Sequence, residues 1–224
     1  MKQSNSLRIA LVSVASMLAS SPVGAQARVQ TATRSVSGAP AVAATQTAVF
    51  AGGCFWGIEA VFEHTKGVIS AVSGYSGGSL VNPSYEQVGE ETSGHAESVR
   101  VTFDPSQVSY EQLLEIFFAV HDPTQLNRQG PDTGPSYRSA VFYQGDAQKQ
   151  AAEAYVAKLT ASKKYSRKIV TEISPLKNFY DAEGYHQHYL TYHPTAPYIV
   201  INDMPKLEYL KARFPGLWRE DPVD

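Results

Sequence analysis

The chain has 224 residues, a formal net charge of −2 and a single cysteine, Cys54. This length suits one domain with a well-filled hydrophobic core. The mild acidity, without any basic run, gives no reason to expect a nucleic acid as partner. One cysteine excludes a disulfide within the chain, so its thiol is either a small buried apolar group or a reactive one.

The first residues predict export. Lys2 and Arg8 accompany the apolar run IALVSVASMLASSPV, and AQA at residues 25–27 has the small-x-small form of a signal-peptidase site. The run is too short and too rich in serine for a membrane span, and no later stretch is apolar enough for one. We therefore expect residues 1–27 to be a signal peptide that directs the protein to the periplasm or the extracellular space. Residues 28–46, which lack aromatic side chains, are expected to be a flexible leader before a domain at 47–224 with a C-terminal helical extension.

The residues around Cys54 predict a strand, a tight turn and a helix. TAVFAGG, residues 47–53, is a short apolar run that ends in two glycines, which are typical of a turn. Apolar residues then recur at helical spacing: Phe55, Ile58, Val61 and Phe62. Cys54 is therefore expected on the first turn of a helix, where unpaired N–H groups and the helix dipole favour a thiolate. The glycines are expected to let another molecule approach the backbone closely.

Strands and helices alternate through the rest of the chain without internal repeats. Strands are expected within residues 67–78, 97–105, 137–144 and 168–176, with a short extended piece at 197–203. Helices are expected within residues 109–122, 146–163, 182–193 and 205–214. This order predicts an α/β fold of the α+β type: a two-layer sandwich with a mixed sheet and long functional loops, of which 122–138 is one.

One of the predicted strands places an acid among apolar side chains. In ESVRVTFDP the residues Val99, Val101 and Phe103 share one face, and Glu97 joins that face if the strand begins early enough. A glutamate at the start of a strand is more often a surface residue. If it is buried, however, its carboxyl group stays protonated near neutral pH and can donate a proton.

Six blocks of the sequence together resemble the A-type peptide methionine sulfoxide reductases: GGCFWG, GYSGG, NPSYEQV, GHAESVRVTFDP, HDPTQLNRQGPDTGPSYRSAVFY and YHQHYL. The resemblance extends from about Val49 to Tyr192, with the blocks in the order and at the spacing of that family. It implies an α/β sandwich related to the ferredoxin-like arrangement. It also implies reduction of the S epimer of methionine sulfoxide, free or in proteins, to methionine, and thus repair of oxidised proteins.

The first block of the resemblance implies the nucleophile and the substrate pocket. By the match at GGCFWG, Cys54 is the nucleophile, and Phe55 and Trp56 form the apolar pocket for the substrate's S-methyl group. Attack on the sulfoxide would leave methionine and a sulfenic acid on Cys54. Without the resemblance, Phe55 and Trp56 would be interpreted as core aromatics of an amphipathic helix.

The later blocks imply the groups that bind the sulfoxide oxygen. Tyr85 and Tyr137 match two phenols that donate hydrogen bonds to this oxygen, and Glu97 matches the acid. Asp132 matches a carboxylate that organises the site, although an aspartate between glycine and proline residues is ordinarily a turn former. The chemistry suits these residue types, because a sulfoxide sulfur is a poor electrophile until its oxygen is hydrogen-bonded or protonated.

The chain lacks the resolving cysteines that many members of the family carry near the C-terminus. The sulfenic acid of Cys54 would then react directly with an external thiol: a thioredoxin, a glutaredoxin, glutathione or a similar reductant. No bound cofactor is implied, and a monomer is expected. A metal site is not expected either: His186 and His193 can share a helix face, but no cysteine or paired acid lies near them in the sequence. YHQHYL is interpreted as packing around the site, and His95 and His121 as structural.

Two other classes of function remain open. A cysteine hydrolase or acyl-transferase would pair Cys54 with His95 or His186 as base, and it would need an oxyanion hole for a carbonyl substrate. A non-catalytic module that binds oxidised peptides would use the aromatic pocket alone and would bind equally well after Cys54→Ala.

Overall fold

A computed structural model describes residues 44–223 of the chain. The expected signal peptide and residues 28–43 of the expected leader lie outside the described residues. The first strand, β1, begins at Gln46, which is the last residue of the expected leader. None of the described helices is long and apolar enough to cross a membrane.

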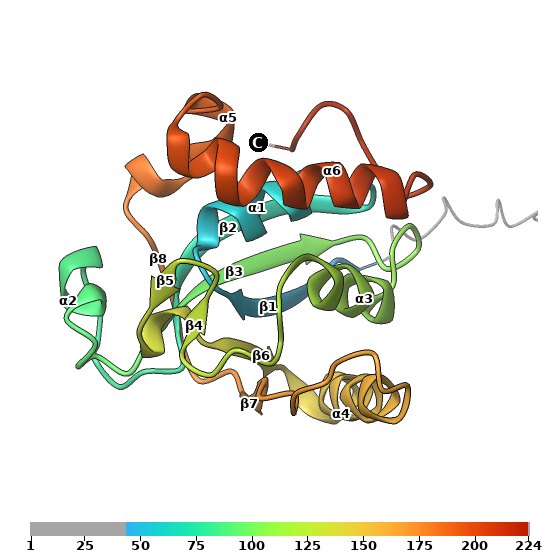
Figure 1. The fold of residues 1–224 in the computed structure, drawn as a ribbon, viewed down its shortest axis with the longest axis horizontal. Helices are drawn as coiled ribbons and strands as arrows, with labels where there is room; N and C mark the ends of the chain where they lie inside the picture. The colour runs from blue at the N-terminus through green and yellow to red at the C-terminus, as the bar shows by residue number, and fades with distance from the viewer. Residues whose placement is uncertain (1–43, 224) are drawn as a thin grey trace, which may run out of the picture. The chain divides into compact units, whose positions relative to one another are not determined.

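A six-stranded mixed sheet lies between the helices (Figure 1), in the order β7-β6-β1-β3-β2-β8. Neighbouring strands are antiparallel except β6 and β7, which are parallel. The strands are β1 (Gln46–Gly52), β2 (Val68–Ser76), β3 (Ala96–Phe103), β6 (Ser139–Tyr143), β7 (Glu172–Pro175) and β8 (Phe179–Asp181). A separate small hairpin, β4 (Arg128–Gln129) with β5 (Asp132–Thr133), orders part of the long loop 122–138.

The helices alternate with these strands. They are α1 (Phe55–Glu63), α2 (Tyr85–Gly89), α3 (Tyr110–Val120), α4 (Gly145–Ala161), α5 (Tyr189–Tyr192) and α6 (Met204–Arg213), with 3₁₀ turns η1 (Pro135–Tyr137) and η2 (Gly184–His186) and a π-helix η3 (Ile199–Asp203). β1, α1, β2, β3, α3 and β6 come in this order along the chain, with α2 inserted before β3 and the β4–β5 hairpin and η1 before β6; they form a β-α-β-β-α-β unit whose strands lie in the order β6-β1-β3-β2. The predicted α/β sandwich with a mixed sheet is therefore confirmed, including its relation to the ferredoxin-like arrangement.

The main hydrophobic core lies between the sheet and the helices α1 and α3. Phe50 on β1 is fully buried there, and its ring stacks on Phe62 of α1 at 5.3 Å and on Phe117 of α3 at 4.9 Å. A smaller buried cluster that includes Val49, Ala51 and Phe142 covers the opposite face of β1. Because β1 is buried on both faces, the residues that follow it are held on a rigid element.

Two segments near the C-terminus differ from the prediction. The expected helix at 182–193 is a 3₁₀ turn and a single short α-helical turn, separated by His188 in the left-handed region at φ +54°. Tertiary hydrogen bonds explain the break, because the backbone N–H of His188 donates to the buried carboxyl of Glu59 at 3.0 Å and the Gln187 amide donates to the carbonyl of Ser73 at 2.9 Å. The expected extended piece at 197–203 is largely the π-helix η3, which runs directly into α6.

Candidate active site

Cys54 is the N-cap residue of α1 and is 7% exposed. The two glycines before it are required by packing within the chain itself. A Cβ on Gly52 would lie 2.9 Å from the ring of Phe117, and Gly53, at φ +91°, would place one 2.5 Å from the Gln129 side chain. The expectation that these glycines admit another molecule is therefore wrong: their missing side chains make room for α3 and the β4 hairpin.

One cavity of about 190 Å³ brings all of the predicted site residues together. It is lined by Cys54, Phe55, Trp56, Tyr85, Glu97, Asp132, Tyr137 and Tyr198. Seven of these eight residues were predicted from the sequence. They come from α1, α2, β3, β5, η1 and the segment just before η3, so only the tertiary fold makes them neighbours.

Glu97 enters the cavity from the start of β3 and is 3% exposed. Its carboxyl group accepts a hydrogen bond from the backbone N–H of Phe55, the first residue of α1, at 3.0 Å. Burial raises the pKa of Glu97 to about 8, and the negative charge of Asp132 adds to this effect, whereas the Phe55 amide opposes it. Glu97 is therefore a protonated acid at neutral pH, as its place on the apolar strand face predicted.

The Cys54 thiol does not behave as the helix position alone predicted. Burial raises its pKa well above the ordinary value, and the negative charges of Glu97 and Asp203 raise it further. The backbone amide of Trp56 and the ammonium group of Lys206 act in the opposite direction, but they are the smaller effects. The prediction of a resting thiolate is corrected: desolvation outweighs the start of the helix, and the resting group is a neutral thiol.

Three phenols line the same cavity as the acid, and all remain protonated. Burial raises the pKa of Tyr85 to about 12, and it also raises the pKa of Tyr137 and of Tyr198. Tyr198 was missed by the sequence analysis. Its hydroxyl donates a hydrogen bond to the Asp132 carboxyl group, so it fixes the side chain that was expected to organise the site. It lies just beyond the last block of the resemblance, and the only signal for it was an aromatic residue in a short apolar segment.

The aromatic wall of the cavity is held by α5 and η2. The Trp56 ring stacks on Tyr189 at 3.8 Å with an angle of 10° between the planes, and its Nε1 donates to Nδ1 of His186 at 3.1 Å. The His186 ring lies between Phe55, at 5.0 Å, and Tyr85, at 4.4 Å. The interpretation of YHQHYL as packing and hydrogen bonding around the site is confirmed.

Neither candidate histidine base is placed for a hydrolase. His186 already accepts from Trp56, and His95 uses its two ring nitrogens on the backbone of Gly78, at 3.2 Å, and Leu80, at 2.8 Å. Neither residue lines the cavity. Over residues 44–223, no three or more His, Cys, Asp or Glu side chains are grouped so that they could hold a metal ion.

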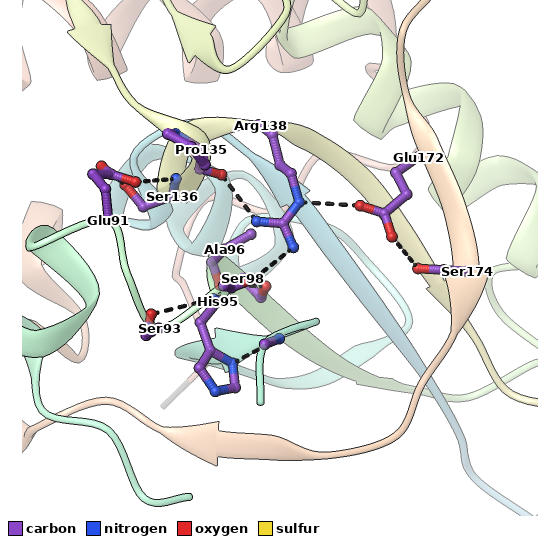
Figure 2. Close-up of polar contacts among 12 residues, drawn as sticks. Glu91, Ser93, His95, Ala96, Ser98, Pro135, Ser136, Arg138, Glu172 and Ser174 are labelled. Atoms are coloured by element: carbon purple, nitrogen blue, oxygen red, sulfur yellow. Dashed lines mark hydrogen bonds and ion pairs between the residues drawn. The ribbon is translucent and has the colours of Figure 1, made fainter. Parts of the chain in front are cut away.

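A network of polar contacts holds Ser136 and Arg138, the two neighbours of Tyr137 in the chain (Figure 2). Glu91, which precedes β3, accepts hydrogen bonds from the backbone N–H and the hydroxyl of Ser136, at 2.8 and 2.6 Å. Arg138 donates to the carbonyl of Gly94 at 3.1 Å and to Glu172 of β7 at 3.1 Å. These contacts tie both neighbours of Tyr137 to the segment that leads to Glu97, so the phenol and the acid are positioned together.

Tyr85 is positioned by a different carboxylate. Glu183 accepts a hydrogen bond from the backbone N–H of Tyr85 at 2.9 Å and from the hydroxyl of Tyr75 at 2.8 Å. The pKa of Glu183 is lowered by these hydrogen bonds despite its partial burial. A charged group thus holds the start of α2 against β2, and this contact brings the Tyr85 ring over His186.

Known proteins similar to this chain fall into one family. The family model described as peptide methionine sulfoxide reductase matches residues 46–216. A protein of Mesorhizobium japonicum named peptide methionine sulfoxide reductase MsrA 2 is 56% identical over 180 residues, which are 80% of this chain and 92% of that protein. A protein of the same name from Synechocystis is 47% identical over 76% of this chain and 80% of its own length.

Two solved structures share the fold. The reduced form of Mxr1 from Saccharomyces cerevisiae has a TM-score of 0.65 and 33% identity, over 73% of this chain and 92% of that one. Methionine sulfoxide reductase A of Corynebacterium diphtheriae has a TM-score of 0.62 and 38% identity, over 68% of this chain and 76% of that one.

Proposed function

The chain belongs to the peptide methionine sulfoxide reductase family, and from this premise we propose how its site carries out the thiol-dependent reduction of methionine sulfoxide. The observation that carries the proposal is the single cavity that joins Cys54 to a protonated acid, to phenols and to two aromatic rings. A nucleophile, an acid and hydrogen-bond donors for a developing negative oxygen are the parts that sulfoxide reduction needs.

The substrate is oriented by two different groups on its sulfur atom, the apolar methyl group and the polar oxygen. The methyl group of the sulfoxide lies against Phe55 and Trp56, whose rings offer apolar surface within the cavity. The sulfoxide oxygen accepts hydrogen bonds from the hydroxyls of Tyr85 and Tyr137. Both phenols keep their protons because burial raises their pKa values, so they act as donors across the working pH range.

The chemical step couples two proton transfers to one substitution. Glu97 donates its proton to the sulfoxide oxygen, which makes the sulfur electrophilic. The carboxylate that this leaves on Glu97 takes the proton of the Cys54 thiol, and the cysteine sulfur attacks, so that the sulfoxide S–O bond breaks and the oxygen, with the proton from Glu97, is transferred to Cys54. The products are methionine and a cysteine sulfenic acid; the substrate sulfur is reduced by two electrons and the cysteine sulfur is oxidised by two.

The first test is a single-turnover measurement with methionine S-sulfoxide and no reductant. We expect one methionine per chain and one dimedone-labelled sulfenic acid on Cys54, with no disulfide within the monomer. The Cys54→Ser variant should form no methionine in this first turnover, that is, it should lose the methionine burst completely. An unlabelled Cys54 after turnover would contradict the proposal.

A second assay, of turnover with a reductant, separates the reductase from the two alternative classes of function. Methyl p-tolyl sulfoxide with dithiothreitol should yield sulfide, which neither a hydrolase nor a binding module produces. A pure binding module would also keep its affinity for oxidised peptides after Cys54→Ala and would release no methionine. His186 packs behind the cavity wall with its Nδ1 accepting from Trp56, and His95 is hydrogen-bonded to the backbone of Gly78 and Leu80. Neither is therefore placed as a base for Cys54, which favours the reductase over the hydrolase.

Location, assembly and reductant are proposals that rest on the sequence. We propose that residues 1–27 are removed during export, that the mature protein works as a monomer in the periplasm or outside the cell, and that a thioredoxin, a glutaredoxin or glutathione is the thiol donor. The mature N-terminus at Arg28, measured on secreted protein by mass spectrometry, tests the first point. Turnover rates with each reductant compare the donors.

A further inference from the structure

Cys54 lines a second, smaller hollow in addition to the cavity of about 190 Å³. This hollow, of about 110 Å³, is lined by Cys54, Gln129, Gly130, Pro131, Asp132, Tyr198, Asn202 and Lys206. It shares Cys54, Asp132 and Tyr198 with the first cavity but contains none of the residues that form the aromatic wall. The hydrogen bond from Tyr198 to Asp132 therefore lies where the two hollows meet, beside Cys54.

The chemistry of the second hollow differs from that of the first. Lys206 lies on its wall, and its ammonium group pairs with the carboxyl of Asp203 at 2.6 Å. Asp203 is fully buried and does not line the hollow, which presents two side chains of opposite charge: the ammonium group of Lys206 and the carboxyl group of Asp132, which accepts the hydrogen bond from Tyr198. Asn202 adds an amide, while its Nδ2 donates to the carbonyl of Tyr198 at 3.1 Å.

The reaction leaves an oxygen atom on one side of the Cys54 sulfur. A thiolate that displaces this oxygen attacks along the line of the S–O bond, from the opposite side, because substitution at divalent sulfur is in-line. The oxygen remains in the first cavity with Glu97 and the phenols, where the acid can protonate the leaving hydroxide. Cys54 also lines the hollow with Lys206, which offers open space beside this residue for an approaching thiolate.

We propose that this second hollow is the entry site for the external thiol that regenerates Cys54, and that Lys206 draws the thiol in as a thiolate. The inference rests on the proposed function of Cys54, since it concerns the half-reaction that follows sulfenic acid formation. A positive charge beside a thiol favours the thiolate, which is the attacking species. The recognised group is a CH₂–SH terminus, carried by a small molecule or by a protein.

The half-reaction balances with two thiols. The first thiolate forms an S–S bond to Cys54 while the S–O bond breaks, and the oxygen leaves as water after taking up a proton. A second thiol attacks the outer sulfur of this mixed disulfide, which releases an external disulfide and returns the Cys54 thiol. The two external thiols are oxidised by two electrons in total, and the cysteine sulfur is reduced by two.

The experiment measures the two half-reactions separately. The oxidised enzyme is first made with one equivalent of methionine sulfoxide, and the methionine burst is recorded; thiol is then added, and loss of the dimedone-reactive sulfenic acid is followed. Lys206→Gln should slow the thiol step about 10-fold and should slow the burst by a much smaller factor, because the Lys206 ammonium group is the smallest of the named effects on the Cys54 pKa. Lys211→Gln, an identical change on an exposed residue of the same helix α6, is the matched control and should alter neither step.

A steric variant covers the case in which Lys206→Gln fails to fold after the loss of the Asp203 pair. Asn202→Phe places a ring in the hollow of about 110 Å³ and should block the thiol step while the burst remains. Glutathione and a reduced thioredoxin, used in parallel arms, show whether a small or a protein thiol is affected more. A slower thiol step with either glutathione or thioredoxin supports the second hollow as the entry site of the thiol.

A charge series sharpens the role of Lys206. 3-Mercaptopropionate, 2-mercaptoethanol and cysteamine have similar size and carry negative, neutral and positive second groups. For each thiol, the rate of the thiol step in Lys206→Gln is divided by the rate in the unchanged protein, so that differences in intrinsic reactivity between the thiols cancel. The loss should be largest for 3-mercaptopropionate and smallest for cysteamine.

Two outcomes overturn the inference. A thiol step that is unchanged in both variants means that the thiol enters elsewhere, and a burst that falls by the same factor as the thiol step in both variants means that the two hollows are not separate sites. Absence of a burst in the unchanged protein is a different result, because it contradicts the proposed function itself.

Discussion

At the scale of single residues, the site depends on an antagonism between Glu97 and Cys54. Both lie in one buried cavity, and the charge of Glu97 is among the causes that raise the pKa of the Cys54 thiol. A thiolate therefore forms most easily while Glu97 is protonated, which is also the state in which Glu97 can donate. Burial of Glu97 thus has two effects: it keeps the proton that Glu97 donates, and it removes a negative charge that would oppose a thiolate on Cys54.

The first prediction at this scale concerns pH. Because the pKa of Glu97 is raised to about 8, the acid is protonated below that pH and ionised above it. The rate of the methionine burst should therefore fall as pH rises through about 8. In Glu97→Gln this fall should disappear, and the rate at neutral pH should drop about 10²–10⁴-fold, since an amide cannot transfer a proton. Single-turnover rates between pH 6 and 10 measure both effects.

Glu90→Gln is a suitable control for this pH experiment. Glu90 is an exposed glutamate at the end of α2, close in sequence to the site but outside the cavity. Its substitution should leave the pH profile and the rate unchanged. A profile for Glu97→Gln that still falls through about pH 8 would assign this proton to another group.

At the scale of elements, α1 and the segment η3–α6 form the floor of the site together. Asp203 and Lys206 of this segment lie over Gly57, where α1 has no side chain. A π-helix such as η3 adds a residue to a turn and shifts the faces of the helix that follows it, and such turns recur at functional sites. In this protein η3 lies between Tyr198, which lines both hollows, and Lys206, which lines only the second hollow.

The second prediction tests this contact between elements. In Gly57→Ala the new Cβ would lie 2.1 Å from Oδ1 of Asp203, which is fully buried, so the Asp203–Lys206 pair or the helix that carries it must shift. We expect a loss of about 1–3 kcal/mol in the free energy of unfolding. Gly89→Ala is the matched control, because no atom lies within 4 Å of its added Cβ, and it should change stability by less than about 0.5 kcal/mol. Urea denaturation followed by circular dichroism measures both.

At the scale of the whole domain, buried acids link stability to pH. Glu59 of α1 is 1% exposed, and burial together with the charge of Glu63 raises its pKa to about 8. Glu97 has a pKa of about 8 for the reason given above. In the unfolded chain both acids return to the ordinary value near 4.5, so the folded protein binds more protons between pH 4.5 and about 8.

The third prediction follows from this difference. Because the folded state binds more protons, the free energy of unfolding should fall as pH rises from about 5 to 8, with each acid contributing on the order of a few kcal/mol. Glu59→Gln should reduce the slope, whereas Glu153→Gln, an exposed change on α4, should not. Urea denaturation at several pH values measures the slope. A stability that rises over this range would contradict the buried, protonated state of these acids.

Much of the site was predictable because its signals are local. The alternation in β3 placed Glu97 on the apolar face, and the run before Cys54 placed the thiol where a helix begins. The sequence blocks named seven of the eight residues that line the cavity. Tyr198 escaped because its role depends on a hydrogen bond to Asp132, 66 residues away, which no local pattern encodes.

The sequence by itself determined the succession of the longer strands and helices from β1 to α4, the chemical types at the site and the absence of a second cysteine, since these depend on local periodicity and on composition. Tertiary structure alone decided the ionisation of the site. Burial reverses the effect of the helix on Cys54 and keeps Glu97 protonated, and burial is a property of what surrounds a residue in space. It also decided the break at His188 and the π-helix, where hydrogen bonds and packing with distant residues outweighed local preference.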